Sequence, residues 1–212
     1  MKIVVISDVH GKWNRLQIPE CDILVSCGDY SFKGEEHMVR DFHKWLDKQD
    51  ANYLISIQGN HELWVEKNFN LAKSTALEVC PRVKFVATDS FELLGKKWYC
   101  SAVTPWFHNW AWNKFRGEEI ANHWKYIPDD TEIMVTHGPV AGILDFIPSQ
   151  NLGVGCLDLK DRIAQLPKLS HHFCGHIHEG YGHHTVNGVQ YYNTSICDEN
   201  YKPVNPITIV EI

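Results

Sequence analysis

The chain begins with a short apolar run that ends abruptly in polar residues. Ile3 to Ile6 are consecutive branched apolar side chains, and the polar turn SDVHG follows them directly. Apolar side chains on both faces are typical of a central strand in a sheet that is covered on both sides. The pattern therefore predicts a buried strand with Asp8 and His10 just beyond its carboxyl end.

The same pattern of a strand followed by polar residues recurs four times. Predicted strands cover residues 22–27, 53–57, 132–136 and 172–174. The polar residues that follow these strands are Asp29, then Asn60 with His61, then His137, and finally His176 with His178. Because the carboxyl ends of stacked parallel strands meet at one edge, we expect all of these side chains to converge there.

Helical spacing separates some of these strands. Within residues 34–50, Met38, Phe42, Trp45 and Leu46 share one face, which predicts an amphipathic helix. Shorter helices are predicted near residues 120–126 and 158–166, each closed by a proline. Strands that alternate with helices are typical of parallel β-α-β units, so the fold class is α/β.

The middle and the end of the chain contain more closely spaced strands. Candidates cover residues 83–86, 91–94, 97–103, 189–193 and 207–210. Leu94-Gly95-Lys96 predicts a hairpin turn, and hence local antiparallel pairing. No repeat, low-complexity tract or linker interrupts the chain, so we predict one domain over residues 1–212.

Composition narrows the class of protein. A formal charge of -6 without a basic run argues against a general nucleic-acid binder. The seven cysteines include no C-x-x-C pair, which favours reduced thiols and a cytoplasmic location. No segment has the apolar length of a membrane span, and the first strand begins too early to leave room for a signal peptide. We therefore expect a protein without membrane partners.

The polar residues at the strand ends suggest a metal site. Two Asp, one Asn and several His without a thiolate suit Mn, Fe, Zn or similar ions in an open catalytic site, whereas structural zinc sites are normally closed and rich in Cys. Seven ligands are too many for one ion but fit two ions that share a bridging carboxylate. Such a pair can stabilise the attacking and leaving oxygens of a phosphoryl displacement. A glycine beside each cluster permits close backbone approach.

Five short motifs in order, SDVHG, CGDY, GNHE, THGP and GHIH, resemble those of the calcineurin-like metallophosphoesterases. Longer segments, including TPWFHNWAWNKFRG and NTSICDENYKPVNPI, resemble the metallophosphoesterase-domain-containing (MPPED-type) subgroup, so the resemblance covers essentially the whole chain. It implies a four-layer α/β/β/α sandwich, in which two mixed sheets are flanked by helices, with a dinuclear metal centre at one sheet edge.

The resemblance also implies a role for each residue. Asp8, His10 and His178 would hold the first ion, Asn60, His137 and His176 would hold the second, and Asp29 would bridge them. His61 would contact the phosphate or the leaving-group oxygen rather than a metal. The cofactors implied are two divalent transition-metal ions, with Mn²⁺ favoured and Fe, Zn, Ni or Co as alternatives.

The function implied is a phosphodiesterase that hydrolyses small phosphodiesters by in-line attack of a metal-activated hydroxide, with 2′,3′- or 3′,5′-cyclic nucleotides as the favoured substrates. A phosphomonoesterase acting on nucleotides or phosphoproteins is the alternative; a non-catalytic adaptor and a nuclease are less favoured. The sequence GDYSFKG lacks the second Asp and the Arg of the protein phosphatase motif GDYVDRG. The residue that orients His61 is therefore open, with Glu62 the nearest candidate.

Candidate substrate contacts are Trp106, His108, Asn109 and Tyr181. The aromatic tract from Trp106 to Phe115 could form part of the core or a wall for a nucleobase, since a base stacks on a flat apolar surface. His37 and His43 are predicted to face solvent. The sequence gives no sign of oligomeric state.

Overall fold

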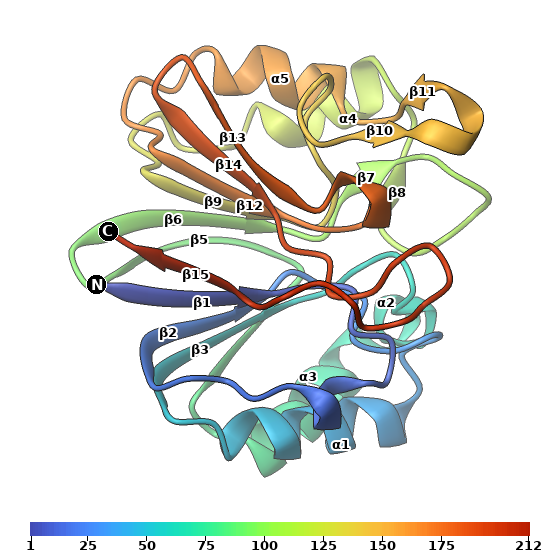
Figure 1. Ribbon diagram of the computed structural model, residues 1–212, viewed down its shortest axis with the longest axis vertical. Coiled ribbons are helices and arrows are strands. Elements are labelled where there is room, and N and C mark those ends of the chain that lie inside the picture. Colours follow the sequence, from blue (N-terminus) through green and yellow to red (C-terminus); the bar gives the residue numbers. More distant parts are fainter.

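The computed structural model describes residues 1–212. Two β-sheets lie face to face, and helices cover the outer face of each sheet (Figure 1). The α/β fold with two mixed sheets flanked by helices is therefore confirmed. None of the helices has both the length and the apolar composition that a membrane crossing needs.

The first sheet has five strands in the order β15-β1-β2-β3-β4. Their bounds are β1 Lys2–Ile6, β2 Cys21–Ser26, β3 Ala51–Ile57, β4 Val83–Val86 and β15 Thr208–Glu211. Strands β1 to β4 are parallel, and β15 pairs antiparallel with β1. The carboxyl ends of β1, β2 and β3 consequently lie side by side.

The second sheet has six strands in the order β13-β14-β12-β9-β6-β5. Their bounds are β5 Thr88–Leu93, β6 Lys96–Ser101, β9 Ile133–Thr136, β12 His171–Cys174, β13 Gly182–Val186 and β14 Val189–Asn193. The four inner strands are parallel, while β5 and β13 are antiparallel hairpin partners at the edges. The predicted hairpin turn between β5 and β6 is confirmed.

Five α-helices and several short elements complete the chain. The α-helices are α1 Glu36–Asp47, α2 Leu63–Lys67, α3 Phe69–Val79, α4 Glu118–Trp124 and α5 Leu157–Ile163. Two short strand pairs are β7 Thr104–Pro105 with β8 Asn113–Lys114, and β10 Phe146–Ile147 with β11 Leu152–Gly153. Single 3-10 turns occur at Trp13–Arg15, Pro148–Gln150 and His178–Gly180. Helices α1 and α3 cover the first sheet, and α4 and α5 cover the second (Figure 1).

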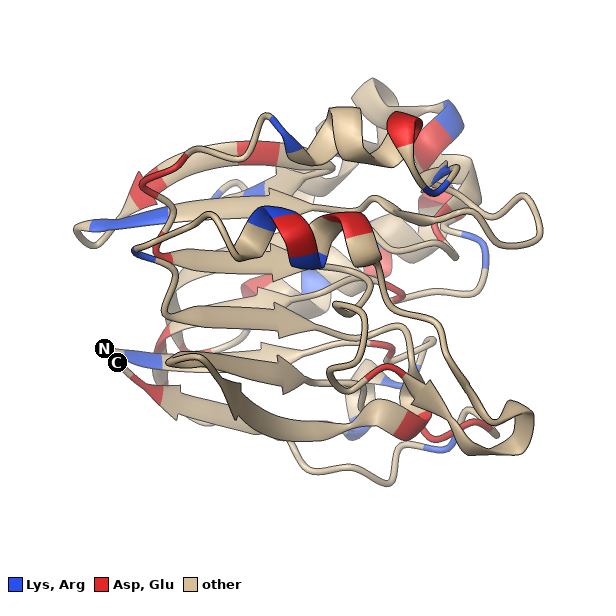
Figure 2. Ribbon diagram, turned by 90° about the horizontal axis from the view of Figure 1, so that it is seen from above, with Lys and Arg blue, Asp and Glu red and all other residues tan.

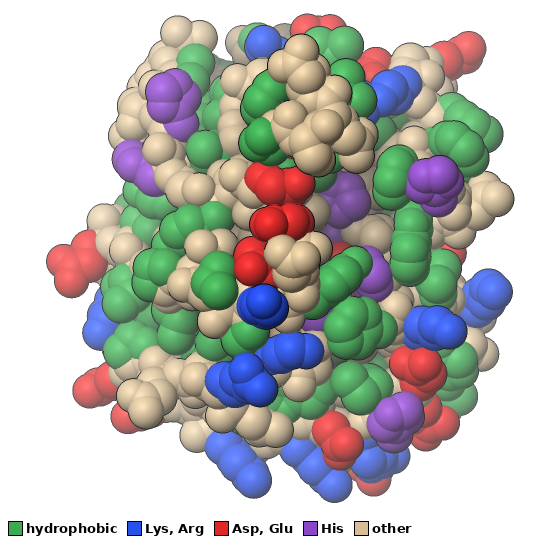
Figure 3. Space-filling model, turned by 45° about the vertical axis from the view of Figure 1, so that its right-hand side comes forward, with side chains coloured by type: hydrophobic (Ala, Val, Ile, Leu, Met, Phe, Trp, Pro, Cys, Tyr) green, Lys and Arg blue, Asp and Glu red, His purple; other side chains and the backbone are tan.

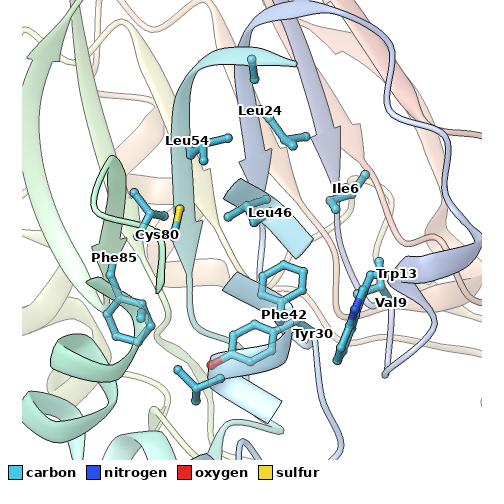
Figure 4. Close-up of a cluster of buried hydrophobic side chains, with 14 of the residues drawn as sticks. Ile6, Val9, Trp13, Leu24, Tyr30, Phe42, Leu46, Leu54, Cys80 and Phe85 are labelled. Carbon is cyan, nitrogen blue, oxygen red and sulfur yellow. The ribbon is translucent and has the colours of Figure 1, made fainter. Parts of the chain in front are cut away.

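The apolar run of β1 is continuous because its side chains alternate between two hydrophobic clusters, one on each face of the sheet. Ile3 and Val5 pack between the two sheets, whereas Val4 and Ile6 pack under α1 and α3. Figure 4 shows this second cluster, in which Phe42 of α1 lies against the first sheet. A strand with core on both faces has no polar side, so its first polar residues come where the strand ends.

His43 on α1 is fully buried, so the prediction that it faces solvent is wrong. Its Nδ1–H donates to the carbonyl of Val39 at 2.7 Å, and its Nε2 accepts from the Ser56 hydroxyl at 3.1 Å. Both ring nitrogens are therefore satisfied by the neutral imidazole. Burial lowers the pKa of His43 to about 4.

We expect this histidine to make the metal-free protein less stable in acid. The unfolded chain binds a proton near pH 6.5 and the folded chain near pH 4, so stability is complete above pH 6.5 and falls as the pH drops towards 4. At pH 5, protonation of His43 in the unfolded chain should lower the free energy of unfolding by about 2 kcal/mol relative to neutral pH. Urea unfolding at pH 7.5 and pH 5 should show this loss in the protein and in a control His37→Gln variant of the same helix. The loss should shrink by about that amount in His43→Gln; equal losses in all three would contradict the assignment.

Candidate metal centre

The carboxyl ends of five strands from both sheets converge at one edge of the sandwich. Figure 2 shows the arrowheads of neighbouring strands on the same side of the molecule, while charged residues are concentrated outside the strands. The seven predicted metal ligands and His61 all follow strands that end here. Stacking of two sheets thus brings together residues up to 170 positions apart, from Asp8 to His178.

Asp8, His10 and His178 form the first group, and their ligand atoms lie within 4.8 Å of one another. Asp8 Oδ1 is 3.4 Å from His178 Nε2 and 3.9 Å from His10 Nε2, and the two Nε2 atoms are 3.3 Å apart. The Nδ1 atoms of the two rings face the carbonyls of Ser31 and Asp198, at 3.2 and 2.7 Å. Such contacts fix a ring so that Nε2 points at a metal.

The second carboxylate oxygen of Asp8 is occupied. Asp8 Oδ2 accepts from the backbone N–H of His176 at 2.8 Å and from the Ser195 hydroxyl at 2.9 Å. Oδ1 is buried and makes no hydrogen bond, although buried carboxylate oxygens are nearly always paired. An anionic oxygen and two inward-facing nitrogens without other partners are a donor set that fits a divalent cation.

The second group consists of Asp29, His137 and His176, again within 4.8 Å. His137 Nε2 lies 3.4 Å from Asp29 Oδ2 and 2.8 Å from Asn60 Oδ1, which places Asn60 in this group. Asp29 also forms a close group with His10 and His61. It therefore lies between the two groups, as a bridging carboxylate would.

Electrostatics in the centre are dominated by the two carboxylates. Burial lowers the pKa of His178, but the nearby Asp8 carboxylate, whose Oδ1 lies 3.4 Å from Nε2, raises the value to about 9. Burial also lowers the pKa of His137, but the neighbouring Asp29 carboxylate outweighs this effect and raises the value to about 9. Burial raises the pKa of Asp8 and of Asp29, yet the surrounding histidines hold both below the usual range. At neutral pH the two carboxylates are therefore balanced by protons on His137 and His178, and a bound cation would displace those protons.

The backbone of the centre is strained. Asp8, His10, Asp29 and His176 have positive φ angles of 52°, 39°, 52° and 69°. Left-handed backbone is costly for residues with a side chain, and such strain tends to occur at functional sites. The close approach predicted at the glycines occurs at Gly59 and Gly175. A Cβ at Gly59 would collide with Asp29 Oδ1, and a Cβ at Gly175 would collide with Asp8 Oδ2.

Glu62 does not orient His61. Its buried carboxylate accepts backbone N–H bonds from Asp29 at 2.9 Å and Gly59 at 2.7 Å, so it joins the loops that follow β2 and β3. Burial and the nearby Asp29 raise the pKa of Glu62 to about 8. His61 Nδ1 instead faces the carbonyl of Phe32 at 3.1 Å. No side-chain pattern could have predicted this partner, because it is a main-chain atom.

A cavity of about 430 Å³ opens beside the centre. Figure 3 shows this face, where histidines lie in a hollow bordered by hydrophobic and acidic side chains. Besides the centre, the cavity is lined by the aromatic residues Trp106, Phe107 and Trp110 and by the aliphatic residues Ile147, Leu152 and Val154. The aromatic tract therefore forms a wall of the cavity more than a part of the core. Trp106 and Phe107 are about half exposed, and Ala111 is the single fully buried residue of the tract.

The predicted substrate contacts are only partly brought to the cavity. Trp106 lines it, while His108, Asn109 and Tyr181 are absent from its lining. Asn109 supports Trp106, whose indole N–H donates to Asn109 Oδ1 at 3.1 Å. The cavity residues that were not predicted as contacts include Trp110, whose ring lies 4.3 Å from that of His61, and Tyr201. Trp110 belongs to the tract singled out from the sequence, but no sequence pattern indicates Tyr201.

Known proteins are similar to this chain along its whole length. Residues 1–180 match the model of the calcineurin-like phosphoesterase family. Human metallophosphoesterase domain-containing protein 1 is 32% identical over 231 residues, which cover 100% of this chain and 71% of the human protein. The mouse protein of the same name gives the same values.

Two solved structures share the fold. Phosphopantetheinyl hydrolase from Mycobacterium tuberculosis superposes with a TM-score of 0.67 at 15% identity, covering 99% of this chain and 95% of the other. An archaeal phosphodiesterase gives a TM-score of 0.51 at 15% identity, covering 100% and 93%. Members of this family are metal-dependent phosphoesterases that typically bind two metal ions, and the chain has His/Asp groups where those ions would bind. With the family model matched over most of its length, this chain belongs to the calcineurin-like phosphoesterases, as a metal-dependent hydrolase of phosphoesters.

Proposed function

We propose that this protein is a phosphodiesterase that hydrolyses small phosphodiesters, with cyclic nucleotides as the favoured class. One observation supports the metal chemistry most strongly: Asp8 Oδ1 is buried and ionised and has no hydrogen-bond partner, although imidazole nitrogens face it. The aromatic cavity beside this atom supports a substrate with a flat apolar group.

The proposed ligands are those predicted from the sequence. Asp8, His10 and His178 would hold one ion, Asn60, His137 and His176 the other, and Asp29 would bridge them. When bound, the ions would supply an activated water and neutralise charge on the phosphoryl group. Nitrogen and oxygen donors without thiolate support Mn²⁺, with Fe, Zn, Ni and Co as alternatives. Seven buried, unpaired cysteines favour the reducing conditions of the cytoplasm.

His61 would act on the leaving group. Its Nδ1 is oriented by the Phe32 carbonyl, and its ring packs against Trp110, so Nε2 is held near Asp29, 3.9 Å from Oδ2. Because its orientation is fixed from two sides, His61 can donate a proton to a departing oxygen without reorganising. A proton donor of this kind suits an alkoxide leaving group such as a nucleoside hydroxyl.

The test is turnover of matched phosphoesters by protein loaded with Mn²⁺. We expect hydrolysis of bis-p-nitrophenyl phosphate and of 2′,3′- or 3′,5′-cyclic nucleotides, with kcat/KM at least about tenfold above that for the corresponding monoesters. Trp106→Ala should raise the KM for cyclic nucleotides roughly tenfold, because base stacking on an aromatic ring contributes about 1–3 kcal/mol. Faster hydrolysis of nucleotide monophosphates or phosphopeptides would support the monoesterase alternative.

The remaining alternatives have less support. A non-catalytic adaptor would have no need for seven convergent donors. If the fully metal-loaded protein hydrolysed none of the tested esters, that result would favour the adaptor. A nuclease needs a surface that follows a phosphate backbone, whereas Glu179 and Glu199 line the cavity beside the single arginine Arg116. Digestion of single- and double-stranded DNA would test that reading.

A further inference from the structure

Tyr201 has an unusual backbone conformation beside the candidate metal centre. It lies in the loop between β14 and β15, and its φ angle is 58°. Left-handed backbone is a genuine outlier for a bulky side chain, and it persists only where the surrounding structure enforces it. In this conformation the phenol ring of Tyr201 lines the cavity.

The loop of Tyr201 is fastened to the centre by one residue. The Asp198 carbonyl accepts from the Tyr201 backbone N–H at 2.9 Å and is also the 2.7 Å partner of His178 Nδ1. Asp198 Oδ1 accepts from the backbone N–H groups of Asn200 and Lys202, at 3.0 and 2.8 Å. The ring of Tyr201 is therefore held in a fixed relation to a proposed metal ligand.

The side chain of Tyr201 completes one side of the cavity. Its ring meets those of His10 and His178 at 89°, with centroids 4.8 and 5.5 Å apart, and it lines the cavity with Asn60 and His61. Its hydroxyl forms no hydrogen bond within the protein, so this donor is free for a ligand. His61 lies near it, with ring centroids 6.3 Å apart.

From this geometry we propose that Tyr201 is a further catalytic residue, whose hydroxyl donates a hydrogen bond to a non-bridging oxygen of the bound phosphoryl group. This proposal rests on the proposed function. His61 would serve the leaving oxygen, while Tyr201, beside His10 and His178, would donate to the phosphoryl group. A neutral phenol is a suitable donor there because its bond strengthens as negative charge grows on the oxygens in the transition state.

Tyr201→Phe tests the proposal, because phenylalanine keeps the ring, its packing and its backbone while removing only the hydroxyl. We expect kcat on bis-p-nitrophenyl phosphate and cyclic nucleotides to fall about 10- to 100-fold with little change in KM, as for loss of a hydrogen bond to a charged group. The affinity of the metal-loaded protein for inorganic phosphate, measured by calorimetry, should also fall severalfold. Tm and bound metal should stay unchanged.

The matched control is Tyr126→Phe, since Tyr126 is exposed on the surface and outside the cavity; it should change none of these quantities. Full kcat and full phosphate affinity in Tyr201→Phe would overturn the proposal. So would an activity loss accompanied by a lower Tm or by lost metal, because the role would then be structural. If the unmodified protein hydrolyses no ester, the proposed function fails, but phosphate affinity still tests Tyr201 by itself.

Discussion

Replacing Asp29 with asparagine is expected to reduce phosphoester hydrolysis by roughly 10³- to 10⁴-fold, since a bridging carboxylate supports both ions and each contributes several kcal/mol to the transition state. Asp29 adjoins both groups of ligand atoms, and its Oδ2 lies 3.4 Å from His137 Nε2. Asparagine keeps the shape but removes the negative charge. Bound metal, measured by elemental analysis after dialysis against Mn²⁺, should drop from two ions to one or fewer.

An exposed acid on α1 provides the control for this substitution. Asp41→Asn removes the same charge far from the centre, so both activity and metal content should be unchanged. If Asp29→Asn retained two ions and turned over within tenfold of the unmodified protein, Asp29 could not be the bridge. Circular dichroism of each variant would verify that the fold is intact.

Replacing His61 with asparagine should lower kcat by about 10²- to 10⁴-fold while both ions remain bound, because loss of a positioned proton donor costs this much without removing a proposed ligand. The effect should depend on the leaving group. p-Nitrophenolate departs without needing a proton, so bis-p-nitrophenyl phosphate should be affected much less than a cyclic nucleotide, whose alkoxide needs one. Parallel kinetics on the two substrates measure this difference.

His37→Gln is the matched control for His61, because His37 is exposed on α1. An equal loss on both substrates would show that His61 contacts the phosphate rather than the leaving oxygen. Loss of bound metal in His61→Asn would show that it acts as a ligand, which its proximity to Asp29 and His10 makes a real alternative.

The candidate site was predictable because its residues follow buried strands. Along β1 both faces are apolar, so Asp8 and His10 could only lie beyond the strand end, where parallel strands place their functional groups. The same reasoning applies to Asp29, Asn60 and His137. The stacking of the two sheets decides which of these side chains lie in the same group of ligand atoms. That grouping was predicted from the family resemblance and not from any local sequence pattern.

Several features had no sequence signal that could identify them. Helices α2 and α3 were not predicted, because their apolar residues form no single stripe and Leu71 on α3 is 49% exposed. His43 was assigned to solvent from its spacing to the polar residues Arg40 and Gln49 on the same helix, but its two hydrogen bonds make burial tolerable. The partner of His61 is a backbone carbonyl and the conformation of Tyr201 is set by its loop, so both depend on tertiary structure alone.

Seven side chains that are scattered along the chain are proposed to surround a pair of cations. A crystal structure of the protein grown with Mn²⁺, with data collected at the manganese absorption edge, tests it most directly. We expect two anomalous peaks roughly 3.5–4 Å apart, one beside Asp8, His10 and His178 and the other beside Asn60, His137 and His176, with Asp29 between them. Absence of ordered manganese at this edge of the sheets, or manganese bound only elsewhere, would contradict the account.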